Sequence, residues 1–111
     1  MCDFKNKRVY LSGAMTGMQD WNREIFQEAA NYIRSQGASH VFNPAFSAPL
    51  DVSKAKRHEA YMLKDLHELT EHMDGRPYYD VLAQLPGWDK SPGAQVEMVV
   101  AKACGIEVVS V

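Results

Sequence analysis

The sequence has few cysteines and almost no net charge, and both shortages exclude classes of protein. Its 111 residues include two cysteines, Cys2 and Cys104, which are too few for a disulfide framework and suit a reducing compartment. The formal net charge is −2, so the broad basic surface that binds nucleic acid is missing. We therefore expect no nucleic-acid partner.

Long hydrophobic runs are also missing. The longest nearly apolar run, residues 96–100, contains Glu97 and is far shorter than a membrane span requires. The N-terminal residues lack the apolar stretch and cleavage site of a secretion signal. We expect a cytoplasmic protein without a membrane partner.

The composition that remains is that of one globular domain. Hydrophobic residues make up 46% of the chain and charged residues 23%, which are ordinary values for a folded domain. A chain of this length can bury a core without disulfides or metal ions. We expect residues 1–111 to form a single domain, with Cys104 as a small buried residue of its core.

Segments with strand character alternate with amphipathic segments along the chain. Strands are expected at residues 8–12, 40–43, 79–85 and 106–111. Helices are expected between residues 22 and 37, over residues 58–73, and between residues 91 and 105. This alternation predicts an α/β three-layer sandwich around a parallel sheet of four to five strands.

Local signals indicate where the helices begin and end and which faces they bury. Asp20 or Asn22 can cap the first helix, Ser91 can cap the last, and Gly37 and Gly105 are typical of helix ends. Helical spacing predicts an apolar stripe on the first helix, formed by Ile25, Ala29, Tyr32 and Ile33. The second helix is expected to bury Tyr61, Met62, Leu66 and Leu69.

The loops after the first and third strands are candidates for ligand binding. In such a sheet the strand-to-helix loops meet at one edge, where ligands bind. The loops at residues 12–22 and 86–95 are rich in Gly, Ser and Thr, and both fall on that edge. Residues 13–17 match neither the dinucleotide-binding pattern nor the P-loop pattern. Residues 91–94 could hold a phosphate or sugar hydroxyls at a helix N-terminus, or only cap the helix.

Glu97 is the most informative single residue. It is the only ionisable group in the segment 94–101, and it lies in the second turn of a helix that starts at the ligand edge. Ala94 and Ala101 share its helix face. Two interpretations stay open: a partly desolvated carboxylate that faces a pocket, or a residue on a solvent stripe near Lys90 or Lys102.

Other polar and aromatic residues carry weaker signals. Asp65 could be a second carboxylate aimed at the pocket, although the sequence alone favours a solvated position for it. His67 and His72 are five residues apart, whereas a zinc helix of the HExxH type needs four, so no metal is expected. No G-x-S-x-G elbow is present. Aromatic side chains could stack on a base or sugar, or belong to the core, at Tyr10, Trp21 and Trp88.

Taken together, residues 9–17, 20–22 and 85–97 resemble a known family. They are similar to the DUF4406 branch of the nucleoside 2-deoxyribosyltransferase-like superfamily. Two motifs carry the resemblance: Tyr-x-x-Gly at Tyr10 to Gly13 and Ser-x-Gly-x-x-x-Glu at Ser91 to Glu97. That superfamily includes deoxyribosyltransferases and 2'-deoxynucleoside 5'-phosphate N-hydrolases. The resemblance covers nearly the whole chain.

The resemblance implies a fold, an assembly and roles for individual residues. The fold is flavodoxin-like or Rossmann-like, and the protein forms a homodimer or a higher homo-oligomer. Glu97 matches the nucleophile that attacks the anomeric carbon, Asp65 the residue that assists departure of the base, and Tyr10 the tyrosine that orients the nucleophile. Ser91 and Gly93 match the loop that holds the 5' end of the substrate. Further substrate contacts are implied at Ser12, Gly13, Thr16, Asp20, Trp21, Asn22 and Trp88.

These residues lead to one functional expectation and one alternative. The expectation is cleavage or transfer at the N-glycosidic bond of a nucleoside or nucleotide, without a metal or another cofactor, since a retaining mechanism needs one carboxylate nucleophile and one proton donor. The alternative is a non-catalytic nucleotide-binding or sensing domain on the same fold. Residues 74–79 look like an insertion that could reshape the pocket.

Overall fold

The computed structural model describes residues 3–15, 18, 22–46 and 57–111. Strands and helices alternate through most of that range. In chain order they are β1 (Arg8–Ser12), α1 (Arg23–Ser35), β2 (His40–Phe42), η2 (Pro44–Phe46), α2 (Arg57–Leu69), β3 (His72–Met73), β4 (Arg76–Pro77), β5 (Val81–Gln84), η4 (Trp88–Lys90), α3 (Pro92–Ala103) and β6 (Glu107–Ser110).

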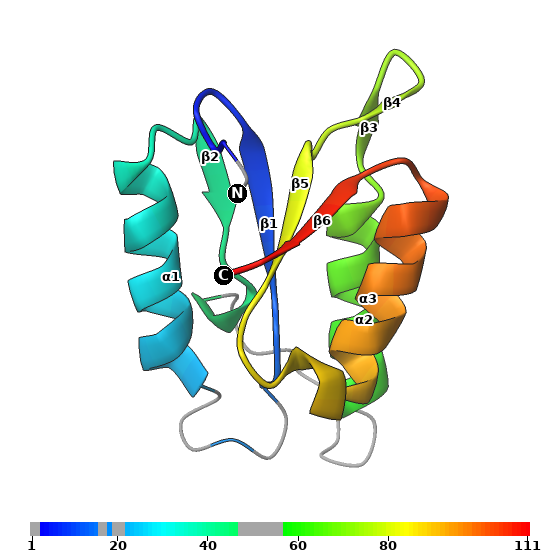
Figure 1. The fold of residues 1–111 in the computed structure, drawn as a ribbon. Helices are drawn as coiled ribbons and strands as arrows, with labels where there is room; N and C mark the ends of the chain where they lie inside the picture. The colour runs from blue at the N-terminus through cyan, green and yellow to red at the C-terminus, as the bar shows by residue number, and fades with distance from the viewer. Residues whose placement is uncertain (1–2, 16–17, 19–21, 47–56) are drawn as a thin grey trace.

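The central sheet has four parallel strands in the order β2-β1-β5-β6. Helix α1 covers one face of the sheet, and α2 and α3 cover the other (Figure 1). Tyr10 of β1 is in register with Phe42 on one side and Leu82 on the other. The predicted α/β three-layer sandwich is confirmed, and its layer order is consistent with a flavodoxin-like fold.

Side chains of β1 alternate between the two faces of the sheet. Val9 and Leu11 belong to the core under α1, and Tyr10 belongs to the core under α2 and α3. The first core also contains Phe4, Phe26, Ala30, Ile33, Val41, Ala45, Val81, Ala83 and Leu85. The second core also contains Leu69, Tyr79, Leu82, Ala101 and Ile106. Because the period is two residues, Ser12 faces the same side as Tyr10.

The predicted ends of two helices are confirmed. Ser91 caps α3, with its Oγ accepting a hydrogen bond from the backbone N–H of Ala94 at 3.2 Å. Gly37 and Gly105 follow α1 and α3 with φ of 95° and 80°, a conformation that glycine adopts without strain. Asn22 occupies the N-cap position of α1, but its side chain makes no capping hydrogen bond.

The second helix ends earlier than predicted, at Leu69 rather than at residue 73. Residues beyond it form an antiparallel hairpin in which His72 pairs with Pro77 and Met73 with Arg76. Its turn, Asp74-Gly75, has positive φ at both positions, as tight two-residue hairpin turns require. The apolar spacing of the sequence continues from Leu69 to Met73, although the helix itself already ends at Leu69.

The hairpin also corrects the expectation for residues 74–79. It leads into the amino-terminal end of β5 and projects from the end of the sheet opposite to the loops that follow β1 and β5 (Figure 1). An insertion there cannot line a pocket at the carboxyl ends of the strands. The prediction that residues 74–79 shape such a pocket directly is wrong.

Two burial predictions are also wrong. Of the predicted stripe on α1, Ile33 is buried, but Ile25 and Tyr32 are 43% and 54% exposed. The helix buries Phe26 and Ala30 with Ile33, and this set has helical spacing too, so periodicity alone could not choose between the two overlapping stripes. Cys104 is exposed, because it lies at the C-cap where the chain leaves α3 for β6.

Candidate functional site

A cavity of about 570 Å³ opens at the edge where β1 and β5 end and where α2 and α3 begin. This is the edge at which parallel α/β sheets bind ligands. Its size is within the range of small-molecule sites. It is lined by Gly13, Ala14, Met15, Met18, Pro44, His58, Tyr61, Met62, Asp65, Pro86, Gly87, Lys90, Ser91, Pro92, Gly93, Ala94 and Glu97.

Glu97 is held at the cavity by two hydroxyl groups of β1. The side chain is 5% exposed. Its Oε1 accepts a hydrogen bond from Ser12 Oγ at 2.8 Å, and its Oε2 accepts one from the Tyr10 hydroxyl. The solvent-stripe interpretation of Glu97 is therefore wrong, and the interpretation as a desolvated carboxylate facing a pocket describes the structure.

The local sequence explains this arrangement. Tyr10 and Ser12 are two residues apart on one strand, so both side chains point to the face that α3 covers. Ala94 and Ala101 are buried beside Glu97 on α3. Their small side chains let the helix approach the strand closely enough for both hydroxyl groups to reach the same carboxylate.

Asp65 supplies a second carboxyl group to the cavity. It is 7% exposed, so the solvated position favoured by the sequence is wrong. Asp65 shares a face of α2 with Leu69, four residues later, and Leu69 is fully buried in the core. Its Oδ1 is buried and has no hydrogen-bond partner among the described residues. An unsatisfied buried acceptor at a cavity is suited to protonation or to a ligand donor.

Burial moves the titration of both carboxyl groups towards neutral pH. It raises the pKa of Glu97 to about 7, although the hydrogen bonds from Tyr10 and Ser12 lower it, and the charge of Asp65 raises it further. Burial also raises the pKa of Asp65 to about 6, against the lowering effect of Lys64. Burial and the neighbouring Glu97 raise the pKa of Tyr10 well above its ordinary value. Tyr10 thus remains a hydrogen-bond donor throughout the physiological range.

The other predicted contact residues fall into three groups. Gly13, Ser91 and Gly93 line the cavity, and Ser12 reaches it through Glu97. Asn22 and Trp88 do not line it; Asn22 instead donates to the backbone carbonyl of Ala14 at 3.1 Å, which ties the loop after β1 to the start of α1. The predictions for Thr16, Asp20 and Trp21 lie outside the described residues.

Gly93 has a packing reason at this position. A Cβ built on it would come within 3.0 Å of the Met62 sulfur. The glycine therefore lets α2 and its methionine pack tightly against the first turn of α3. This close approach is part of the cavity wall.

Several cavity residues have no counterpart among the residues singled out from the sequence. The cavity wall includes the apolar side chains of Met15, Met18 and Met62, while His58 and Lys90 add basic groups. Met62 was expected in the core face of the second helix, and its helical spacing gave no sign that this face continues into a cavity. Methionines divided between the loop after β1 and helix α2 leave no periodic signal.

Two kinds of feature are missing from the described residues. No group of three or more His, Cys, Asp or Glu residues in that part of the chain could hold a metal ion. None of the helices within the described ranges is long and apolar enough to cross a membrane.

Comparison with known proteins identifies the family but no characterised relative. No curated protein and no solved structure matches the chain. One family model, described as a domain of unknown function (DUF4406), matches residues 7–110. The match spans the whole sheet and includes Tyr10, Asp65 and Glu97. The chain therefore belongs to the DUF4406 family.

Proposed function

We propose that the protein cleaves the N-glycosidic bond of a nucleoside or nucleotide, most simply a 2'-deoxy one, with Glu97 as the nucleophile. The observation that carries the proposal is the buried Glu97 carboxyl group, held by Tyr10 and Ser12 beside a second carboxyl group in one cavity. Two carboxyl groups with separate tasks are what a retaining glycosidic mechanism needs.

The first chemical step forms a covalent intermediate. One Glu97 oxygen attacks the anomeric carbon, the bond from that carbon to the base nitrogen breaks, and the electron pair stays on the base. Asp65 gives its proton to the departing base. Water or a second base then attacks the anomeric carbon, releases Glu97, and returns a proton to Asp65. Water as the acceptor gives hydrolysis, and a base gives transfer.

The reaction requires that Asp65 hold a proton and that Glu97 be ionised. Burial raises the pKa of Glu97 more than that of Asp65 in the free cavity. Two hydroxyl donors point at Glu97, whereas Asp65 Oδ1 receives none. The positive charge that develops on the sugar in the transition state also favours the Glu97 anion. We therefore assign the proton to Asp65 during the reaction.

The apolar wall supports a base as the leaving group. Thioether and aromatic side chains of Met15, Met62 and Tyr61 offer polarisable surface to a flat heterocycle.

We further propose that the protein acts in the cytoplasm as a homodimer or a higher homo-oligomer. Light scattering at micromolar concentration tests the assembly, and a monomer would contradict it.

The activity is tested by release of free base. The protein is incubated with a panel of deoxynucleosides and their 5'-monophosphates, with and without an acceptor base, and the products are separated by chromatography. The matched variants are Glu97→Gln and Glu28→Gln; Glu28 is an exposed residue of α1, on the other face of the sheet. We expect base release by the parent protein and by the Glu28→Gln protein only.

A new nucleoside in the presence of acceptor base would identify a transferase. Base release that is equal in the Glu97→Gln protein would refute Glu97 as the nucleophile. No product across the panel, together with nucleotide binding by calorimetry, would favour the sensing domain instead.

A further inference from the structure

Two aromatic residues behind the cavity hold the ring of Tyr10. Phe42 of β2 stacks on it with ring centroids 5.1 Å apart and planes 26° apart, and Tyr79 meets it edge-on at 5.6 Å and 83°. Tyr10 is fully buried and Tyr79 is 1% exposed. Neither Phe42 nor Tyr79 lines the cavity. Both therefore act on the site only through Tyr10.

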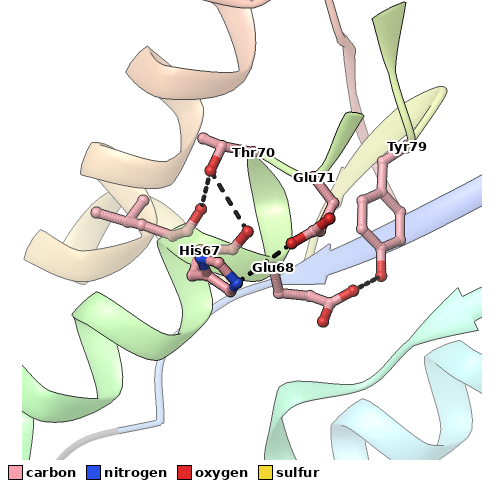
Figure 2. Close-up of polar contacts among 6 residues, drawn as sticks. His67, Glu68, Thr70, Glu71 and Tyr79 are labelled. Carbon is pink, nitrogen blue, oxygen red and sulfur yellow. Dashed lines mark hydrogen bonds and ion pairs between the residues drawn. The ribbon is translucent and has the colours of Figure 1, made fainter. Parts of the chain in front are cut away.

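Tyr79 is itself fixed by helix α2. Its hydroxyl group donates a hydrogen bond to Glu68 Oε2, as Figure 2 shows. Glu68 lies three residues after Asp65, so one helix carries both the second carboxyl group of the cavity and the anchor of Tyr79. The position of α2 is thereby linked to the aromatic ring that contacts Tyr10.

The end of α2 is secured around this anchor. Thr70 Oγ1 donates to the carbonyl oxygen of Leu66 at 2.7 Å, and His67 pairs with Glu71 at 3.2 Å (Figure 2). The backbone N–H of Tyr78, next to Tyr79, donates to the Glu71 carbonyl oxygen at 2.8 Å. The segment before β5 is therefore tied to the last turn of α2 through backbone as well as side chains.

The orientation of the Tyr10 ring matters because its hydroxyl group has one proton and two acceptors. One acceptor is Glu97 Oε2, and the other is the backbone carbonyl oxygen of Asp65 at 3.3 Å. A small shift of the ring would move the hydroxyl oxygen away from Glu97 Oε2, so that the proton would go to the carbonyl oxygen and leave the nucleophile with Ser12 as its remaining donor. Phe42 stacked on the ring and Tyr79 edge-on to it, with their own centroids 6.4 Å apart, form one aromatic cluster with Tyr10 that opposes that shift.

We propose that Tyr79, anchored by Glu68, is a positioning residue that keeps the Tyr10 hydroxyl group directed at Glu97. The inference rests on the proposed role of Glu97 and deepens it. It assigns to the segment before β5 a task that the cavity residues alone do not reveal: keeping the nucleophile ionised and oriented.

The expected effect on titration follows from the charges around the site. Titratable groups that face Glu97 or share its cavity are Tyr10 from β1, His58, Tyr61 and Asp65 from α2, and Lys90 from η4. The hydrogen bond from Tyr10 lowers the pKa of Glu97, so a misdirected Tyr10 raises it. The charged and titratable groups near Tyr79 are His40, Glu68, Glu71, Tyr78 and Tyr10.

The first experiment compares Tyr79→Leu, Tyr79→Phe and Glu68→Gln with a control, Tyr32→Leu, in which the altered tyrosine is 54% exposed on α1. We expect Tyr79→Leu to lower kcat by about tenfold or more, with KM nearly unchanged, because misplaced catalytic groups cost this much. The acid limb of its pH profile should move up by about half a pH unit or more. This shift corresponds to losing part of the free energy of one charge-assisted hydrogen bond. Tyr79→Phe and Glu68→Gln should move it less, and Tyr32→Leu not at all.

The second experiment does not depend on activity. The Glu97 carboxyl carbon is followed by NMR against pH in glutamate-labelled protein and assigned by its absence in the Glu97→Gln protein. A higher titration midpoint in the Tyr79→Leu protein supports the inference even if the parent protein releases no base, in which case only the proposed function fails. An unchanged midpoint in the folded Tyr79→Leu protein overturns the inference. Should that variant not fold, the midpoint in the Tyr79→Phe protein decides in the same way.

Discussion

Removing the buried charge of Glu97 should make the protein more stable relative to the parent at alkaline pH than at acidic pH. The perturbation is Glu97→Gln, which keeps the size of the side chain and removes its ionisation. Of the Tyr10 and Ser12 hydroxyl groups, which donate to Glu97, one can keep donating to the new amide oxygen while the other rotates to accept from the amide nitrogen. The substitution therefore tests charge with little change in packing.

The sign follows from proton binding. In the folded protein the pKa of Glu97 is about 7, against an ordinary value of 4.5. Between those two pH values the folded state binds more protons than the unfolded state, so stability falls as pH rises through that window. Each pKa unit corresponds to about 1.4 kcal/mol, so the full loss is about 3 kcal/mol. Asp65 contributes in the same direction, and it is present in both proteins.

The assay is urea unfolding of the parent and the Glu97→Gln protein at about pH 5 and about pH 8. We expect the free energy of unfolding of the variant to gain about 2.5 kcal/mol relative to the parent between the two conditions, because pH 5 already lies above the ordinary pKa of 4.5. Equal slopes of unfolding free energy against urea in both proteins would show that the unfolded state has not changed. A stability difference that is the same at both pH values would refute the account of a desolvated Glu97.

Two further predictions test other parts of the structure. Ser12→Ala leaves Oε1 of Glu97 without its donor, so it should raise the pKa of Glu97. We expect kcat to fall by about tenfold, which is the value of one hydrogen bond to a charged group. A pH profile identical to that of the parent would contradict this. Cys104 is exposed at the end of α3. In a variant without the other cysteine, it should react with a thiol reagent as fast in the native protein as in the urea-unfolded protein. Strong protection in the native protein would contradict this.

The layers of the fold could be predicted from the sequence because strand and helix periods differ and alternate along the chain. The two ends of α3 could be predicted from Ser91 and Gly105, because an N-cap hydroxyl group and a residue with positive φ act within one helical turn. The hairpin at residues 72–77 was missed, because two-residue strands have no period and only Asp74-Gly75 signals the turn.

The candidate site could be predicted only in part. Glu97 stood out because it is the only ionisable residue in the segment 94–101, but whether it faced solvent or cavity depended on how α3 sits on the sheet. Asp65 looked solvated for the same reason: nothing within α2 shows which charged position is turned inwards. Tyr79 and Glu68 gave no signal, because their relation to Tyr10 arises from ring contacts between residues 69 positions apart in the chain.

The central claim is that Glu97 forms a bond to the sugar. The most direct measurement is the intact mass of the protein after a brief reaction with an active substrate and an acid quench, followed by peptide mapping. The account predicts an added glycosyl group on the peptide that contains Glu97, and no such adduct in the Glu97→Gln protein. Base release by the Glu97→Gln protein at the rate of the parent, with no adduct in either, would contradict it.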